Sequence, residues 1–104
     1  MISQLEKLLG TPRDGSLLRY SLGLEYAKAG DHARAVEYLR EAVTRDPLYS
    51  AAWKMLGKSL MEIQQPAEAL TAYERGIAAA QEKGDRQAEK EMTVFAKRLR
   101  KQAG

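Results

Sequence analysis

The side chains that usually carry out chemistry are few in this sequence. His32 is the single histidine, it stands beside Asp31, and the chain contains no cysteine. A zinc site would therefore need carboxylates almost alone, which is atypical, and His32 has no obvious nucleophile to activate as a general base. We expect no catalytic residue, no metal site and no bound cofactor.

One glycine-containing segment could in principle hold a phosphate group. Residues 10–15 read GTPRDG, but no lysine followed by serine or threonine completes a phosphate-binding loop. Asp14 and Glu82 have no partner acid that the sequence reveals for acid–base catalysis. The sequence predicts that the protein is not an enzyme.

Basic side chains gather at the C-terminal end. Residues 97–104 contain Lys97, Arg98, Arg100 and Lys101 and no acid, whereas residues 1–96 contain 13 basic and 14 acidic side chains. Such an end can attract nucleic acid or an anionic surface. Cations also stabilise the C-terminal end of a helix, and four charges give only weak binding at physiological salt. A solvated helix end is the favoured interpretation, and we expect no specific nucleic-acid partner.

The N-terminal residues show no recognisable targeting signal. Residues 1–7 lack the basic region and apolar run of a secretory signal, and no apolar run approaches the roughly 20 residues of a membrane span. Without cysteines, nothing argues for an oxidising compartment. We expect a cytoplasmic protein with no membrane span.

The elements that must position the side chains are helices. Apolar residues recur at helical spacing, and the breaks fall at Gly10–Gly15, Gly30-Asp31, Asp46-Pro47, Gln64–Pro66 and Lys83-Gly84. Side chains expected to cap the following helices are those of Ser16, Asp31, Ser50 and Asp85. The sequence predicts an all-α fold of about six helices and no strand.

The helical pattern repeats every 34 residues. Leu22-Gly23 recurs as Leu56-Gly57, Ala35 as Ala69, and Leu39 as Tyr73. A period of this length indicates stacked units that bury their apolar faces on one another. We expect one domain, residues 1–104, made of a half-repeat helix at 1–9, repeats at 16–49 and 50–83, and a capping helix at 85–102.

The two ends of the stack differ in how well they keep the period. Ile2, Val36 and Leu70 share a column, so the first helix resembles the second helix of an incomplete unit. Lys90 and Glu91 stand 34 residues after Leu56 and Gly57, so the last helix does not continue the pattern. A finite stack needs such a cap with one polar face.

Two glycines occupy equivalent places in the middle of helices. Gly23 and Gly57 each cost about 1 kcal/mol relative to alanine. Their recurrence predicts a close approach between the helices of a hairpin, with the small residues Ala35 and Ala69 opposite.

The repeated pattern resembles the tetratricopeptide repeat. The segment from Trp53 to Leu60, followed by Ala69 and Tyr73, is similar to its signature, and residues 22–47 are similar again. Arg19 stands where the second unit has Trp53, and Leu60 replaces an expected aromatic. The resemblance implies α-helical hairpins in a right-handed superhelix, and a concave face, lined by the first helix of each unit, that binds peptide segments of other proteins.

On the first helix of each unit, the residues that do not face the second helix of the hairpin are the candidate peptide-binding set. They are Tyr20, Leu24, Ala27 and Lys28 in one unit and Lys54, Lys58, Met61 and Glu62 in the next. Such a surface suits a peptide with an acidic group beside an apolar anchor. The chain has no asparagine, so the lysine chemistry, but not the full carboxylate clamp of some family members, is carried over. The alternative is that Tyr20 and Leu24 pack on a neighbouring helix while the lysines are solvated.

Two aromatic residues have a structural and a binding interpretation. Trp53 is expected to fill space between hairpins rather than anchor a partner. Phe95 is expected to be buried on the second unit, and an exposed Phe95 would instead suit a dimer interface.

Three functions remain open at this point. The leading hypothesis is a non-enzymatic adaptor or co-chaperone-like module that binds a protein or peptide, monomeric or weakly dimeric. The second is a structural subunit that associates through its helical ends. The third is weak binding of nucleic acid or an anionic surface through the basic C-terminal helix.

Overall fold

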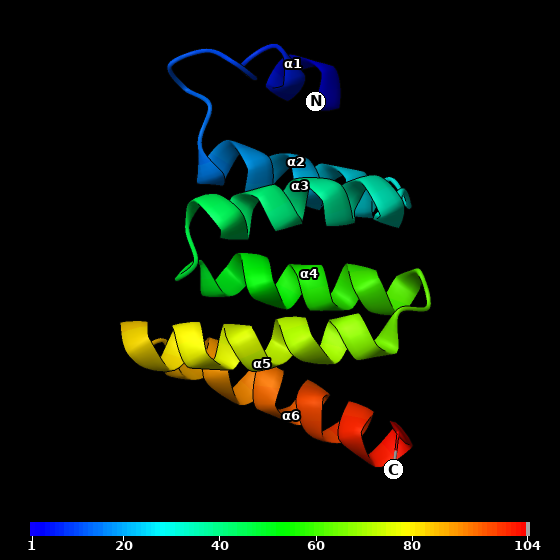
Figure 1. Cartoon of the computed structure of the whole chain (residues 1–104). Helices are drawn as coiled ribbons and strands as arrows, with labels where there is room; N and C mark the ends of the chain where they lie inside the picture. Colours follow the sequence, from blue (N-terminus) through cyan, green and yellow to red (C-terminus); the bar gives the residue numbers. More distant parts are fainter. Residues whose placement is uncertain (104) are drawn as a thin grey trace.

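The computed structural model describes residues 1–103, which form six α-helices and no strand (Figure 1). The helices are α1 (Ile2–Glu6), α2 (Ser16–Lys28), α3 (His32–Arg45), α4 (Ser50–Glu62), α5 (Pro66–Lys83) and α6 (Arg86–Ala103). They stack in chain order, with the N-terminus at one end of the molecule and the C-terminus at the other (Figure 1). The predicted all-α fold is confirmed.

Helix ends follow local chemistry, with two corrections. Asp31 caps α3 by accepting the Arg34 amide at 3.2 Å, and Asp85 accepts the Ala88 amide at 3.2 Å at the start of α6. The predicted caps at Ser16 and Ser50 are wrong, because α2 and α4 have Gly15 and Tyr49 at that position and no side-chain cap.

The Ser50 hydroxyl is used between helices instead. It donates a hydrogen bond to the Asp85 carboxylate at 2.9 Å, and Ser50 is buried. This contact joins the start of α4 to the start of α6, and it holds the pKa of the Asp85 carboxyl below its usual range, together with the Ala88 amide.

The first helix is shorter than residues 1–9. It ends at Glu6 and a turn follows to Gly10, whose φ of 77° favours glycine. The Glu6 carboxylate accepts hydrogen bonds from the hydroxyls of Tyr26 (2.8 Å) and Tyr38 (3.1 Å), whose rings stack at 5.6 Å. The segment is therefore tied to the first hairpin by polar contacts, while half-buried apolar side chains rest on the core: Ile2, Leu5, Leu8 and Leu9.

The six helices form an inner and an outer layer. The hairpins are α2 with α3 and α4 with α5, and α6 packs on α5. The backbone of α4 also approaches α2 and α6, whereas within residues 1–103 the backbones of α3 and α5 do not approach each other. Because helices crowd together on the inside of a curved stack and separate on the outside, α2, α4 and α6 form the inner layer.

In the core, glycines in the middle of helices lie directly against large side chains of the neighbouring helix. A Cβ atom on Gly23 would lie 2.6 Å from Leu39 Cγ, and one on Gly57 would collide with the Tyr73 ring. The predicted close approach is confirmed, but the main partners are Leu39 and Tyr73 rather than the alanines. Gly76 makes a third such contact, against Met92 and Trp53, which the sequence analysis did not single out.

No helix within the described residues has the length and apolar character needed to cross a lipid bilayer. The division of the chain into a half-repeat, two repeats and a cap remains an interpretation of the helix pattern.

Candidate protein-binding groove

The inner layer brings the predicted binding residues of α2 and α4 next to α6. Each of these helices packs on the second helix of its hairpin through a row of buried side chains, which includes Leu22 on α2 and Leu56 on α4. The residues outside this row are left half-buried or exposed. They form, with the adjoining side chains of α6, the surface that we call the inner groove.

Tyr20 lies at the end of the inner groove nearest the N-terminus of α2. It is half-buried, and its ring is tilted against Tyr49 with 4.8 Å between centroids. Burial raises the pKa of the Tyr49 hydroxyl. This pair joins α2 to the residue before α4, so Tyr20 has both a packing role and a partly open face.

Lys54 is not a free cation. Its Nζ donates a hydrogen bond to Glu91 of α6 at 3.1 Å, and 22% of the Lys54 side chain is exposed. Neither of the two predicted roles for Lys54, a ligand-binding point charge or a solvated one, anticipated this ion pair. An acidic ligand would have to compete with Glu91 for this lysine.

Lys58 lies over an aromatic ring of α6. Its Nζ is 5.5 Å from the centroid of Phe95, which suits a cation–π contact. The Lys58 side chain is exposed, and within residues 1–103 no carboxylate lies within ion-pair distance of it. Lys58 therefore remains available to a ligand.

Met61 and Phe95 border a small hollow at the C-terminal end of the inner groove. The hollow has a volume of 160 Å³, and Tyr73, Arg98 and Leu99 also line it. Phe95 packs on the second unit as predicted, 5.3 Å from the Tyr73 ring, but it is half-buried rather than buried. Burial also raises the pKa of the Tyr73 hydroxyl to about 12, so it stays protonated at neutral pH.

The remaining predicted residues have mixed surroundings. Leu24 and Ala27 are half-buried, while Lys28 is exposed and forms a weak pair with Glu25 at 3.3 Å. Glu62 is exposed at the end of α4. Their role in binding remains a prediction.

The 34-residue pattern does not predict the contribution of α6 to the inner groove. Glu91 and Phe95 stand 37 residues after Lys54 and Lys58, not 34. Helix α5 is four residues longer than α3 and the loop after it is two residues shorter, so α6 begins 36 residues after α4. The signal was present in the late stop at Gly84, four residues beyond the place where the first unit's period would end α5.

Trp53 and His32 lie outside the candidate set of the inner groove. Trp53 is buried, and its indole nitrogen donates to the Pro47 carbonyl at 2.8 Å, consistent with the predicted space-filling role. The buried Nδ1 of His32 has no hydrogen-bond partner. Within residues 1–103, no three potential metal-binding side chains lie together.

Comparison with known proteins identifies the repeat. A family model described as tetratricopeptide repeat matches residues 20–84, more than half of the chain. The chain belongs to the tetratricopeptide repeat family. The predicted helical repeat fold is thus confirmed, and proteins of this family are generally interaction modules that bind other proteins rather than enzymes.

Individual relatives are similar along most of their length. A TPR repeat-containing protein of Pseudomonas aeruginosa is 50% identical over 99 residues, which cover 95% of this chain and 94% of that protein. A protein from Bordetella parapertussis, solved in solution, has a TM-score of 0.82 at 43% identity, and the match covers 98% of this chain and 89% of that one.

A more distant group of relatives includes a co-chaperone. The Sgt2 TPR domain from Aspergillus fumigatus has a TM-score of 0.81 at 28% identity, and the match covers 98% of this chain and 67% of that one. The heat-shock protein cognate co-chaperone sgt12 of the same fungus is 39% identical over 54 residues, which cover 52% of this chain and 16% of that protein.

Proposed function

We propose that this protein is a co-chaperone-like adaptor that binds an extended peptide segment of a partner protein in the inner groove. The observation that carries the proposal is the exposed Lys58 beside the hollow of Met61 and Phe95. A cation next to an apolar hollow suits a peptide with an acidic side chain beside an apolar anchor. The likeness to the Sgt2 domain supports the adaptor role, and the predicted cytoplasmic location is part of the same proposal.

The charges of the inner groove refine the expected ligand. Lys54 is occupied by Glu91, so Lys58 and Arg98 are the cations best placed to meet a carboxylate. Lysine acts as a flexible point charge, whereas the guanidinium of arginine offers a fixed fork of donors. The acidic group of the ligand is expected near Arg98 and Lys58, with the apolar anchor in the hollow between them.

The test is affinity capture from a native lysate with three forms of the protein. We compare the wild type, Lys58→Glu in the inner groove, and Lys97→Glu as a matched control on an exposed part of α6. We expect one or a few proteins to be retained by the wild type and by Lys97→Glu and lost by Lys58→Glu, followed by direct titration of the purified partner.

The other outcomes would overturn the proposal in distinguishable ways. Loss with Lys97→Glu alone would indicate that the basic C-terminal helix is the binding surface. Equal capture by all three forms would exclude the inner groove, and a dimer that persists at micromolar concentration in light scattering would then favour the structural-subunit hypothesis.

A further inference from the structure

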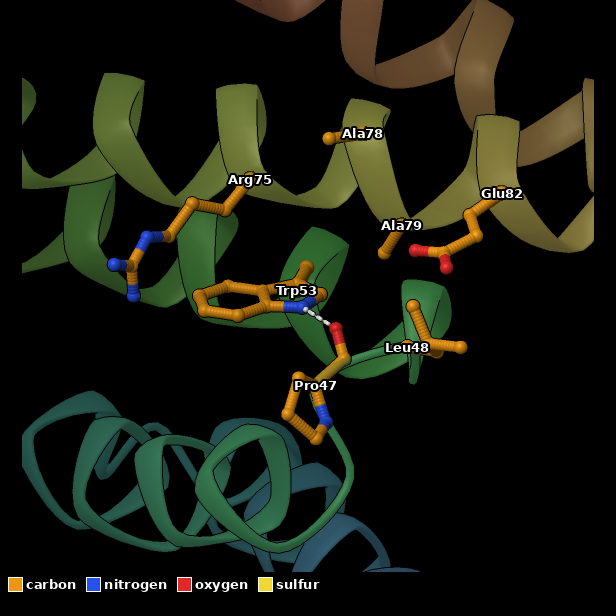
Figure 2. A pocket seen from close by; sticks show the side chains of 7 residues that line it. All are labelled: Pro47, Leu48, Trp53, Arg75, Ala78, Ala79 and Glu82. Atoms are coloured by element: carbon orange, nitrogen blue, oxygen red, sulfur yellow. Dashed lines mark hydrogen bonds between the residues drawn. The ribbon is translucent and has the colours of Figure 1, made fainter.

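Two hollows meet at Trp53 on the outer side of the stack. One has a volume of 340 Å³ and the other 320 Å³, and Pro47, Trp53 and Arg75 line both. They lie where α3 and α5 separate, close to the loop that joins α3 to α4 (Figure 2). None of their lining residues belongs to the candidate set of the inner groove, so this is a separate surface.

Trp53 forms a fixed wall between the hollows. Its indole nitrogen donates to the Pro47 carbonyl at 2.8 Å, which satisfies its one polar atom and holds the ring in place (Figure 2). Only 7% of Trp53 is exposed, so the residue contributes a rigid edge to the hollows, and binding there costs it no further conformational freedom.

Arg75 lies over this wall without an acidic partner. Its guanidinium carbon is 5.7 Å from the centre of the Trp53 ring, and no carboxylate of residues 1–103 lies within 4.0 Å of its nitrogens. Arg40, which also lines the second hollow, is paired with Glu68 at 2.7 Å. This end of the site therefore has an excess of positive charge.

The other end carries a negative charge. Glu82 lies on the opposite side of Trp53 from Arg75 (Figure 2) and has no cationic partner among the described residues. Arg75 and Glu82 are two helical turns apart on α5, which is about 10 Å along its axis. The space between them is walled by the apolar side chains of Leu48, Ala78 and Ala79.

At the equivalent position of the first unit, the charged side chains are paired with one another. Arg19 and Glu41 occupy the places equivalent to Trp53 and Arg75. There Arg19 donates to Glu41 at 2.6 Å and to Asp14, which is equivalent to Leu48, at 2.7 Å. The second unit replaces this closed ion network with a hollow, an aromatic wall and two separated, unpaired charges.

We propose that the surface around Trp53 is a second peptide-binding site, independent of the inner groove. It takes an extended segment of a partner protein with an acidic side chain at Arg75, apolar side chains against Leu48, Ala78 and Ala79, and a basic side chain at Glu82. In the polyproline II form an extended chain rises about 3.1 Å per residue and its side chains return to the same face every third residue, so the two charges of the ligand are three residues apart. The guanidinium can hold the carboxylate with two parallel hydrogen bonds.

The test uses three capped synthetic octapeptides that differ only in charge. Between Gly-Ser flanks they carry Glu-Leu-Leu-Lys, Glu-Leu-Leu-Glu or Lys-Leu-Leu-Lys. Trp53 is the single tryptophan of the chain, so its emission reports directly on occupancy of the site. The wild type is expected to bind the mixed-charge peptide about threefold or more tightly than either of the others.

Charge variants should switch this preference. Arg75→Glu places two acids along the site and is expected to prefer the doubly basic peptide, while Glu82→Lys is expected to prefer the doubly acidic one. Lys97→Glu, which lies outside both surfaces, serves as the matched control and should leave the wild-type order unchanged, while Lys58→Glu tests whether the peptides bind in the inner groove. Both Arg75 and Glu82 are exposed, so their substitution should not disturb the fold. Circular dichroism verifies that each variant retains its helices.

Three results would overturn the proposal. The first is the absence of a saturable emission change with every peptide up to about 5 mM, beyond the weak end of specific recognition. The second is an unchanged order of preference in Arg75→Glu and Glu82→Lys. The third is a preference that follows Lys58→Glu, which would assign the peptides to the inner groove.

Discussion

At the scale of single residues, three mid-helix glycines set how closely neighbouring helices pack. Gly23, Gly57 and Gly76 leave room for Leu39, Tyr73 and Met92 respectively. Glycine costs about 1 kcal/mol in a helix interior relative to alanine, and the burial of a large side chain over each glycine offsets that cost.

Replacing Gly57 with alanine should therefore destabilise the protein, against the trend of helix propensity. The new Cβ atom would meet the Tyr73 ring, and overpacking of this kind costs about 1–3 kcal/mol. We expect the melting temperature of Gly57→Ala to fall by roughly 4–8 °C for each kcal/mol, measured by circular dichroism. The bulkier Gly57→Leu is expected to lower it further.

The matched background for this variant is Tyr73→Ala, which removes the ring that the new methyl group would meet. In that background Gly57→Ala should become neutral or stabilising. A single Gly57→Ala variant that melts at or above the wild-type temperature would show that the helices can separate without cost.

The glycine contact also shows what the sequence can predict at this scale. The recurrence of Gly23 and Gly57 was enough to predict a close approach, because an unfavourable residue that recurs needs a compensation. Small residues suit a narrow gap, so the sequence favours Ala35 and Ala69 as the partners of these glycines. Helical side chains lean toward the N-terminus of their helix, and Leu39 and Tyr73, one turn after those alanines, reach over the glycines.

At the scale of elements, the loop before α2 is joined to two helices by one carboxylate. Asp14 accepts hydrogen bonds from Arg19 at 3.0 and 2.7 Å and from the Gly10 amide at 2.9 Å. Arg19 also donates to Glu41 of α3 at 2.6 Å, and Arg45 of α3 lies 4.0 Å from Asp14. The Arg19 hydrogen bonds, followed by that of Gly10, hold the pKa of Asp14 well below its usual range.

This network predicts a pH-dependent stability. Because the folded-state pKa of Asp14 is lowered, its ionised form stabilises the folded state at pH values above the unfolded pKa of about 3.9, and this contribution is lost as the pH falls toward the folded value. The Asp14→Asn variant should melt below the wild type at pH 7. The difference should stay constant down to about pH 5 and shrink below about pH 4.

Thermal melts of both proteins between pH 7 and pH 2 measure this difference. Asp46→Asn is a suitable control, since Asp46 lies in a loop and forms no ion pair within 4.0 Å among residues 1–103. A gap between wild type and Asp14→Asn that is independent of pH would mean that hydrogen bonding, and not the charge of Asp14, joins the loop to the helices.

The sequence predicts most helix boundaries around the inner groove but not the face that α6 presents to it. The boundaries of α2 to α5 could be predicted because glycine, proline and aspartate terminate or begin helices by local chemistry. The phase of α6 could not, because it depends on the extra turn of α5 and on which face of α6, here the one that carries Met92, then meets Gly76 of α5. A fixed period of 34 residues therefore hid the pairing of Glu91 with Lys54.

At the scale of the whole molecule, the basic C-terminal end is part of the stack. Leu99 is buried, and Arg98 lines the hollow beside Met61. Arg100 pairs with Glu74 of α5 at 2.9 Å, whereas Lys97 and Lys101 are exposed. A stack is stabilised largely by contacts between neighbours, so the last turns of α6 support the second hairpin as well as carrying charge.

Removal of residues 97–104 should for this reason destabilise the protein, and not simply delete a charged tail. Loss of a buried leucine costs about 2–5 kcal/mol, and each kcal/mol lowers the melting temperature by roughly 4–8 °C in a domain of this size. The double variant Lys97→Gln, Lys101→Gln removes two charges without touching Leu99, and should melt within a few degrees of the wild type. If the truncated protein melts at the wild-type temperature, α6 beyond Ala96 does not support the fold, and its charges can be assigned a function of their own. If the truncation alone lowers the melting temperature, a loss of binding after truncation reports unfolding of the second hairpin. The double variant is then the form that tests the charges without disturbing the fold.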